Sequence, residues 1–114
     1  MNTEKLKTLE QVHDAIDIVE NERAKTGLTP SQRVDLETAS VRLRNLERTI
    51  IRIKTNELVA SLTSDAKALK DLASQIKQSA EKLDEVANAI EKAASIVEAF
   101  IKIFTTAVSA GFLE

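Results

Sequence analysis

The sequence predicts an all-α protein in which an antiparallel helical hairpin packs against one long C-terminal helix, as in a three-helix bundle or coiled coil. Two observations lead to this prediction. The 114 residues include only two Gly and one Pro, whereas Ala, Leu, Ile, Glu and Lys dominate, and this composition is typical of long helices. Apolar residues also recur at 3–4 spacing along most of the chain, which is the helical period. We expect a single helical domain over residues 1–114.

The first helix is expected over about residues 3–26. Gly27 should end it, because glycine readily takes the left-handed conformation that follows many helix C-termini. The apolar seam is formed by Leu9, Val12, Ile16 and Val19, and the same face is widened by Leu6, Ala15 and Ile18.

The second helix is expected over about residues 30–60, and its start signal is strong. Thr29 can act as the N-cap, Pro30 occupies the first helical position, and Gln32 completes a capping box. Because only about four residues link it to the first helix, the two should form an antiparallel hairpin. Its seam consists of Leu36, Ala39, Leu43, Leu46, Ile50, Ile53 and Ala60.

A turn is expected at residues 61–65, because the apolar repeat that begins at Leu62 is out of phase with the preceding seam by two residues. Two residues correspond to about 200° of rotation on a helix. Thr63 or Ser64 could cap a new helix there. The alternative is one continuous helix of about eighty residues from Pro30 to Ala110, which would require an intermolecular bundle.

The third helix is expected over about residues 64–110, because a large apolar residue returns at every seventh position of this segment. The repeat consists of Leu62, Leu69, Ile76, Leu83, Ile90, Val97 and Phe104. Four residues after each of the first five lies an alanine, from Ala66 to Ala94. These alanines either let a neighbouring helix approach closely or are simply good helix formers at an edge. At this length the helix would extend about five turns beyond the hairpin.

The overhanging segment, residues 93–113, is apolar around most of its circumference and therefore needs cover on more than one side. We expect oligomerisation to supply that cover, through an interface formed by Ile90, Val97, Phe100, Ile101, Phe104 and Val108. The alternatives are a groove for a helix of another protein and a membrane-active segment over residues 93–113. A full transmembrane span is disfavoured by Glu98 and Lys102, each of which would cost about 2.5–3.5 kcal/mol at mid-membrane.

The second helix carries a line of arginines, Arg44, Arg48 and Arg52, that could follow phosphates on nucleic acid. The chain has a net charge of −2 and only three aromatic residues, all Phe, so nucleic-acid binding is disfavoured. Ion pairs to the first helix are the preferred interpretation, with Asp14 near Arg42 and Glu4 near Arg52.

The sequence contains no pattern that indicates catalysis. His13 is the single histidine, and a metal site needs several converging ligands, so we expect no metal, no cofactor and no enzyme activity. The absence of cysteine excludes disulfides and thiol chemistry. The charged N-terminus does not resemble a secretory signal, which favours a cytoplasmic protein.

The function predicted from sequence is therefore that of a non-catalytic helical interaction protein of the adaptor or regulator type. It would associate with itself, or with a partner helix, through the apolar C-terminal half of the third helix. The alternative is a membrane-active protein of the toxin or lysis type, whose C-terminal helix lies on or inserts into a bilayer.

Overall fold

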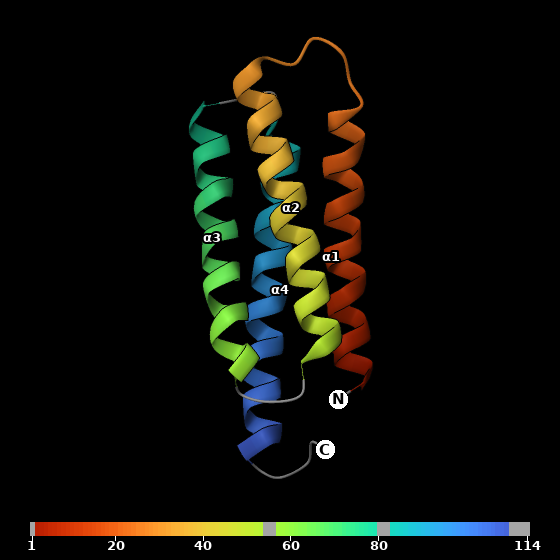
Figure 1. Ribbon diagram of the computed structural model, residues 1–114, viewed down its shortest axis with the longest axis vertical. Helices are drawn as coiled ribbons and strands as arrows, with labels where there is room; N and C mark the ends of the chain where they lie inside the picture. Colours follow the sequence, from red (N-terminus) through yellow and green to blue (C-terminus); the bar gives the residue numbers. More distant parts are fainter. Residues whose placement is uncertain (1, 54–56, 80–82, 110–114) are drawn as a thin grey trace.

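The computed structural model describes residues 2–53, 57–79 and 83–109. Four α-helices account for nearly all of these residues (Figure 1): α1 (Asn2–Arg23), α2 (Pro30–Arg52), α3 (Glu57–Ser79) and α4 (Asp84–Ser109). No strand occurs within the described ranges. The all-α prediction is therefore confirmed, whereas the number of helices differs from the three that were expected.

The four helices form an elongated bundle of 51 × 20 × 17 Å in which each helix packs against two neighbours. α1 contacts α2 and α4, and α3 contacts the same two helices from the other side. Neighbouring helices run in opposite directions, and α4 extends beyond the other three at the lower end of the view (Figure 1). The chain thus closes a ring of helices around one core.

The hairpin between α1 and α2 forms as the sequence predicts, but α1 ends at Arg23 and not at Gly27, which lies in the connection. Gly27 has a φ of +82°, which is the left-handed region that glycine adopts without a steric penalty. Thr29 caps α2: its side-chain oxygen accepts from the backbone N–H of Gln32 at 3.1 Å, and the Gln32 side chain accepts from the Thr29 N–H at 2.9 Å. The capping box is confirmed.

The boundary between α2 and α3 lies earlier than predicted. α2 ends at Arg52, Ile53 has an extended backbone, and α3 is already helical from Glu57. Residues 61–65, expected to form a turn, therefore belong to the interior of α3. The Thr63 hydroxyl donates to the carbonyl of Val59 at 2.9 Å, so it bonds back into its own helix rather than capping a new one.

The single helix expected over residues 64–110 is instead two helices, because α3 ends at Ser79 and α4 begins at Asp84. The physical reason is burial. A continuous helix would leave the apolar face of residues 93–104 uncovered by its own chain. By running back along α3, α4 places this face against α1 and α3 and removes it from water, which is favourable at about 25 cal/mol per Å².

Two ion pairs confirm that α3 and α4 are antiparallel. Lys70 pairs with Glu98, and Lys77 pairs with Glu91. From the first pair to the second, the position moves forward by seven residues along α3 and back by seven residues along α4. The pairs therefore lie on one side of the α3–α4 contact, two turns apart.

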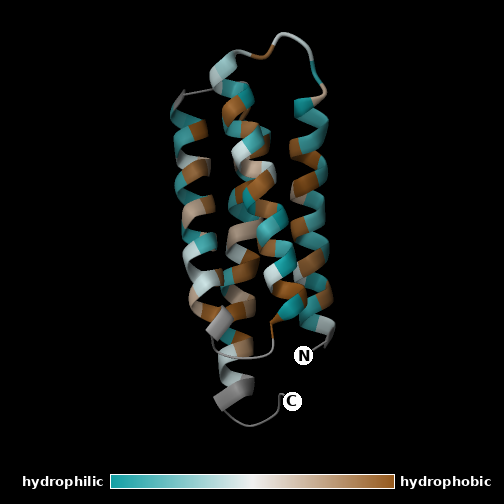
Figure 2. Ribbon diagram, in the orientation of Figure 1, coloured by the Kyte–Doolittle hydropathy of each residue, from teal (hydrophilic) through white to brown (hydrophobic). Residues whose placement is uncertain are grey.

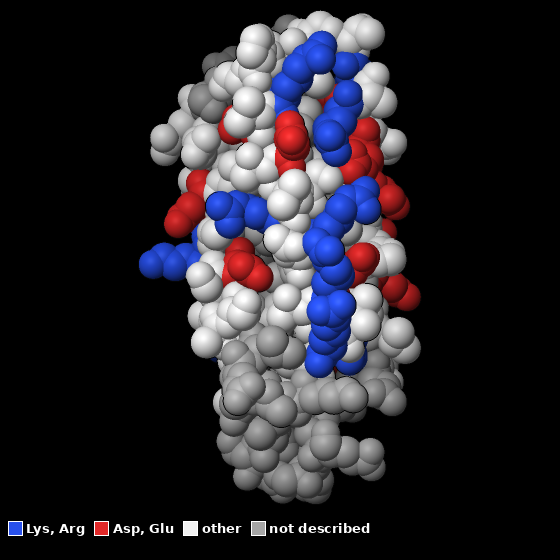
Figure 3. Space-filling view, in the orientation of Figure 1, with Lys and Arg blue, Asp and Glu red and all other residues white. Residues whose placement is uncertain are grey.

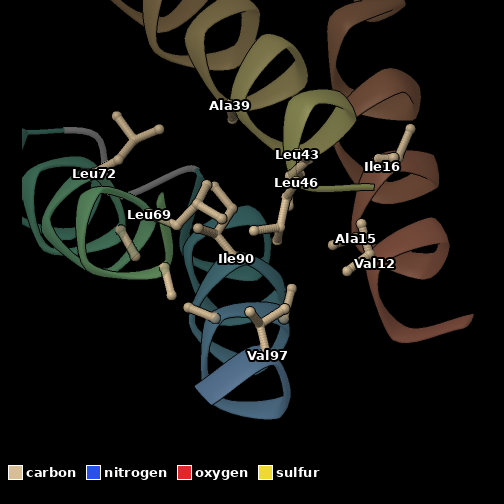
Figure 4. Packing of buried hydrophobic residues seen from close by; sticks show 14 of the residues in the cluster. Val12, Ala15, Ile16, Ala39, Leu43, Leu46, Leu69, Leu72, Ile90 and Val97 are labelled. Carbon is tan, nitrogen blue, oxygen red and sulfur yellow. The ribbon is translucent and has the colours of Figure 1, made fainter. Parts of the chain in front are cut away.

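The core is built from the seven-residue repeat, which continues in phase through both helices. All of its members, from Leu62 to Phe104, are at most 2% exposed. Figure 4 shows Ile90 of α4, Leu69 of α3 and Leu46 of α2 directed into the shared interior, opposite Val12 of α1. Apolar residues form stripes along the helices, and polar residues cover the remaining surface (Figure 2).

The alanines that follow the repeat are buried too. Ala66 and Ala73 of α3 and Ala87 and Ala94 of α4 are fully inaccessible to solvent; Ala80 lies outside the described residues. Small side chains let two helix backbones approach closely, and α3 with α4 forms the most extensive of the four helix contacts. These four alanines therefore belong to the core and not to a surface edge, which favours the close-packing interpretation.

Candidate interaction surface

A polar network fixes α1 against α2. The Glu20 carboxylate accepts from Arg44 Nη2 at 2.7 Å and from the Ser40 hydroxyl at 2.9 Å, and Arg23 Nη1 donates to the same carboxylate at 2.9 Å. The hydrogen bond from Arg44 is the largest influence on Glu20 and holds the pKa of its carboxyl below the usual range, although burial acts in the opposite direction. Glu20 in turn raises the pKa of the Arg44 guanidinium.

A second contact defines the register of these two helices. His13 of α1 pairs with Glu47 of α2, seven residues along each helix from the contact between Glu20 and Ser40. The two contacts step in opposite directions, as they must in an antiparallel pair. The height of any other residue on this face follows by counting from them.

Two exposed apolar side chains lie together at the lower end of the α1–α2 face. Leu6 of α1 and Ile51 of α2 are 61% and 53% exposed. Both line a hollow of about 640 Å³, together with Leu9, His13 and the carboxylates of Glu10, Asp14 and Asp17. Lys5 donates from Nζ to the backbone carbonyl of Ile51 at 2.9 Å and so ties the two helices together beside the hollow. We call Leu6 and Ile51 the apolar pair.

The outer face of α2 carries two more exposed apolar residues, Val34 and Val41. They line a shallow hollow of about 510 Å³ that also includes Arg42 and Asn45. A neighbouring hollow of about 440 Å³ lies between Arg48 and Arg52 of α2 and Ser61 and Asp65 of α3. Figure 3 shows Lys and Arg side chains in a line down this side of the molecule, with Asp and Glu on either side.

The arginines of α2 make fewer ion pairs than predicted. Among the described residues, Arg44 pairs with α1 but Arg48 and Arg52 have no acidic partner within 4.0 Å. The expected pairs of Asp14 with Arg42 and of Glu4 with Arg52 do not form. Arg42 lies instead on the α3 side of α2, where its charge counteracts the raising of the Asp65 pKa by burial.

Most of the interface residues predicted from sequence are already packed within the chain. Ile90, Val97, Phe100 and Phe104 are at most 2% exposed, and the rings of Phe100 and Phe104 have centroids 6.1 Å apart. Ile101 is partly buried against the core, and the side chain of Val108 lies outside the described residues. The proposed interface stays a prediction, and a partner could reach these four side chains only if the bundle opened.

The sequence predicted that Leu6 widens the apolar face of the first helix, and this is wrong, because its side chain is exposed. The buried positions of α1 are Thr8, Val12, Ala15, Ile16 and Val19, which share one face of the helix, and Leu6 is not on that face. The spacing of these positions was the available signal, because Leu6 falls about 120° from Val12 around the helix axis. Ile51 was not identified as exposed either, although it directly follows the buried Ile50.

A buried carboxylate is the other feature that the sequence did not indicate. Asp35, at the start of α2, is 4% exposed. Its Oδ1 accepts from Gln75 Nε2 of α3 at 3.2 Å, whereas its Oδ2 has no hydrogen-bond partner in the described part of the chain. An incompletely satisfied buried carboxylate destabilises the fold, so Asp35 is a local weak point between α2 and α3.

The described ranges contain no group of three His, Cys, Asp or Glu side chains arranged to hold a metal ion. In the same ranges no helix combines the length and apolarity that crossing a membrane requires. Comparison with models of known protein families, with curated proteins and with solved structures gave no match.

Proposed function

We propose that the protein is a non-catalytic helical interaction protein, of the adaptor or regulator type, that associates with itself as a folded four-helix bundle. One observation carries this proposal: two large apolar side chains that are exposed in the described ranges border the same hollow on two adjacent helices. They are Leu6 on α1 and Ile51 on α2. Scattered apolar residues need no explanation, but a concentration of them on one side is typical of a binding surface.

The charges of the same side support this proposal. The outer surface of α1 carries the exposed acids Glu10, Asp14 and Asp17, whereas the outer surface of α2 carries Arg48 and Arg52 without ion-pair partners in the described part. Surfaces of opposite sign favour specific association because a wrong orientation brings like charges together. A surface that carries both signs next to each other is suited to a partner with the same arrangement.

The sequence placed self-association on α4, through Ile90, Val97, Phe100, Ile101, Phe104 and Val108. Exposure favours the α1–α2 side instead, because Ile103 is the one large apolar side chain of α4 that is exposed among the described residues, at 40%. Association through the buried α4 positions would have to replace contacts within the chain. The α1–α2 side requires no such exchange.

Sedimentation velocity across a range of micromolar concentrations tests the proposal. A species heavier than the 12.5 kDa chain, whose fraction rises with concentration while the helix content stays unchanged, is the expected result. A monomer at all concentrations would contradict it. Flotation with neutral and anionic vesicles is the parallel measurement: binding of the monomer to vesicles, without self-association, would support a membrane-active protein instead.

A further inference from the structure

The apolar pair, Leu6 and Ile51, defines a place on the molecular surface where two helices each expose a large aliphatic side chain. The two residues border the same hollow, together with Leu9. Glu10 lies about one turn from Leu6 on α1, and Arg48 lies about one turn from Ile51 on α2. Both charged side chains are exposed and have no ion-pair partner in the described ranges.

The register of α1 and α2 places Glu10 and Arg48 within two residues of the same height. His13 is level with Glu47. Three residues back along α1 is Glu10, and three residues forward along α2 is Ile50, because the helices are antiparallel and have the same rise per residue. Glu10 on α1 is therefore level with the stretch between Arg48 and Ile51 on α2.

A two-fold rotation about an axis parallel to the bundle uses this arrangement. Such a rotation keeps every residue at its height, but it exchanges the positions of α1 and α2. The α1 helix of a second copy would then face α2 of the first. Glu10 of each copy would lie opposite Arg48 of the other, and the two apolar pairs would meet at the axis.

We propose that the α1–α2 face is an isologous dimer interface whose occupant is a second copy of this chain, with four apolar side chains at the two-fold axis and two Glu10–Arg48 pairs beside it. The inference rests on the proposed function and specifies its geometry. Each contact occurs twice, as two-fold symmetry requires. A foreign helix with one sign of charge would be repelled by part of this face, whereas a second copy presents Arg48 to Glu10 and Glu10 to Arg48.

The apolar part of the interface is tested by Leu6→Asp, with Val34→Asp as the control. Leu6 and Val34 are both 61% exposed, and each is the fifth residue of its helix. The two substitutions therefore place the same charge in equivalent local environments. Leu6→Asp should raise the dimer dissociation constant about tenfold or more, as for a central interface residue, whereas Val34→Asp should leave it nearly unchanged.

The ion pairs are tested by mixing two variants. Glu10→Arg alone places two like-charge pairs in the homodimer, and so does Arg48→Glu alone, so each variant should dimerise several-fold more weakly than wild type. In a mixed dimer of the two variants, both positions again hold opposite charges. Mixing should therefore restore association to near the wild-type level, measured by sedimentation velocity with one variant fluorescently labelled.

The outcomes separate this geometry from self-association in general. Restoration on mixing requires that position 10 of one copy faces position 48 of the other, because a contact within one chain cannot be repaired by a second chain. If the wild-type protein dimerises but Leu6→Asp also dimerises, or mixing the two charge variants does not increase association, this interface is overturned and the proposed function is left intact. A wild-type protein that stays monomeric would overturn both. Circular dichroism of each variant confirms that the helices are retained.

Discussion

Truncation of Ile90 to alanine provides a direct test of whether α4 belongs to the core of one chain. Ile90 is fully buried, and Ile→Ala removes three carbon groups, worth about 0.8 kcal/mol each in transfer from water. The transfer contribution is therefore about 2.4 kcal/mol. The cavity left behind increases the loss, so we expect a decrease of about 3 kcal/mol in the free energy of unfolding, within the range of about 2–5 kcal/mol for such substitutions.

Ile103→Ala, in the same helix, is the matched control. Ile103 is 40% exposed, so only part of the transfer contribution applies and water can occupy the space that is left. We expect a decrease of about 1 kcal/mol or less. The lower intrinsic helix propensity of isoleucine relative to alanine affects both variants alike.

Urea denaturation followed by circular dichroism measures the difference. With a slope of about 1–3 kcal/mol per molar urea, the Ile90→Ala midpoint should fall by about 1 M or more. The experiment is run at two protein concentrations, because loss of an intermolecular contact would make the destabilisation depend on concentration. Equal destabilisation by both substitutions, or an Ile90→Ala effect that changes with concentration, would refute the assignment of α4 to the intramolecular core.

Three further predictions concern local features of the bundle. Thr29→Ala removes the α2 capping box and should lower the free energy of unfolding by about 1 kcal/mol, measured by the same urea titration. The pKa of Glu20 is lowered in the folded protein. Its ion pair therefore stabilises the fold fully above the pKa that Glu20 has in the unfolded chain, and this stabilisation is lost as the pH falls through the folded pKa. Glu20→Gln should lower the melting temperature at neutral pH, and the difference from wild type should disappear in acid. Burial raises the pKa of Asp65, so its effect on stability is opposite to that of Glu20: above its folded pKa, ionised Asp65 destabilises the fold. Asp65→Asn should therefore raise the melting temperature at neutral pH but not well below pH about 4. If the difference in melting temperature between a variant and wild type is the same at every pH, the corresponding pKa shift of Glu20 or Asp65 is contradicted.

The sequence predicted the helical class, the hairpin of α1 with α2 and its capping box, because these depend on local interactions that adjacent residues encode. It did not reveal that the long C-terminal repeat is divided between α3 and α4. Ile76 and Leu83 are seven residues apart and both are buried, so the repeat keeps its phase across the end of one helix and the start of the next. A periodic apolar pattern indicates which face of a helix is buried. One long helix and two shorter helices that face the same core can have the same pattern.

The signals that mark this boundary were weak but present. Lys77 lies in the last turn of α3, and Asp84 and Glu85 lie in the first turn of α4, which is how charges are placed to complement helix dipoles. No Gly or Pro occurs between Ser79 and Asp84, so the stronger signals were missing. The candidate surface was harder still, because the exposure of Leu6 and Ile51 depends on which neighbours each helix acquires.

The ring order of the helices has a consequence for how the chain folds. Three of the four contacts join helices that follow one another in sequence, so most of the core can form by closing short loops, which favours fast folding. The contact between α1 and α4 is different, because it can form only after the chain has closed a loop that contains all of α2 and α3. The entropy lost in closing a loop increases only slowly with its length, but this contact is still the least local in the bundle. The contact between the first and last helices should therefore be the last of the four to form during folding.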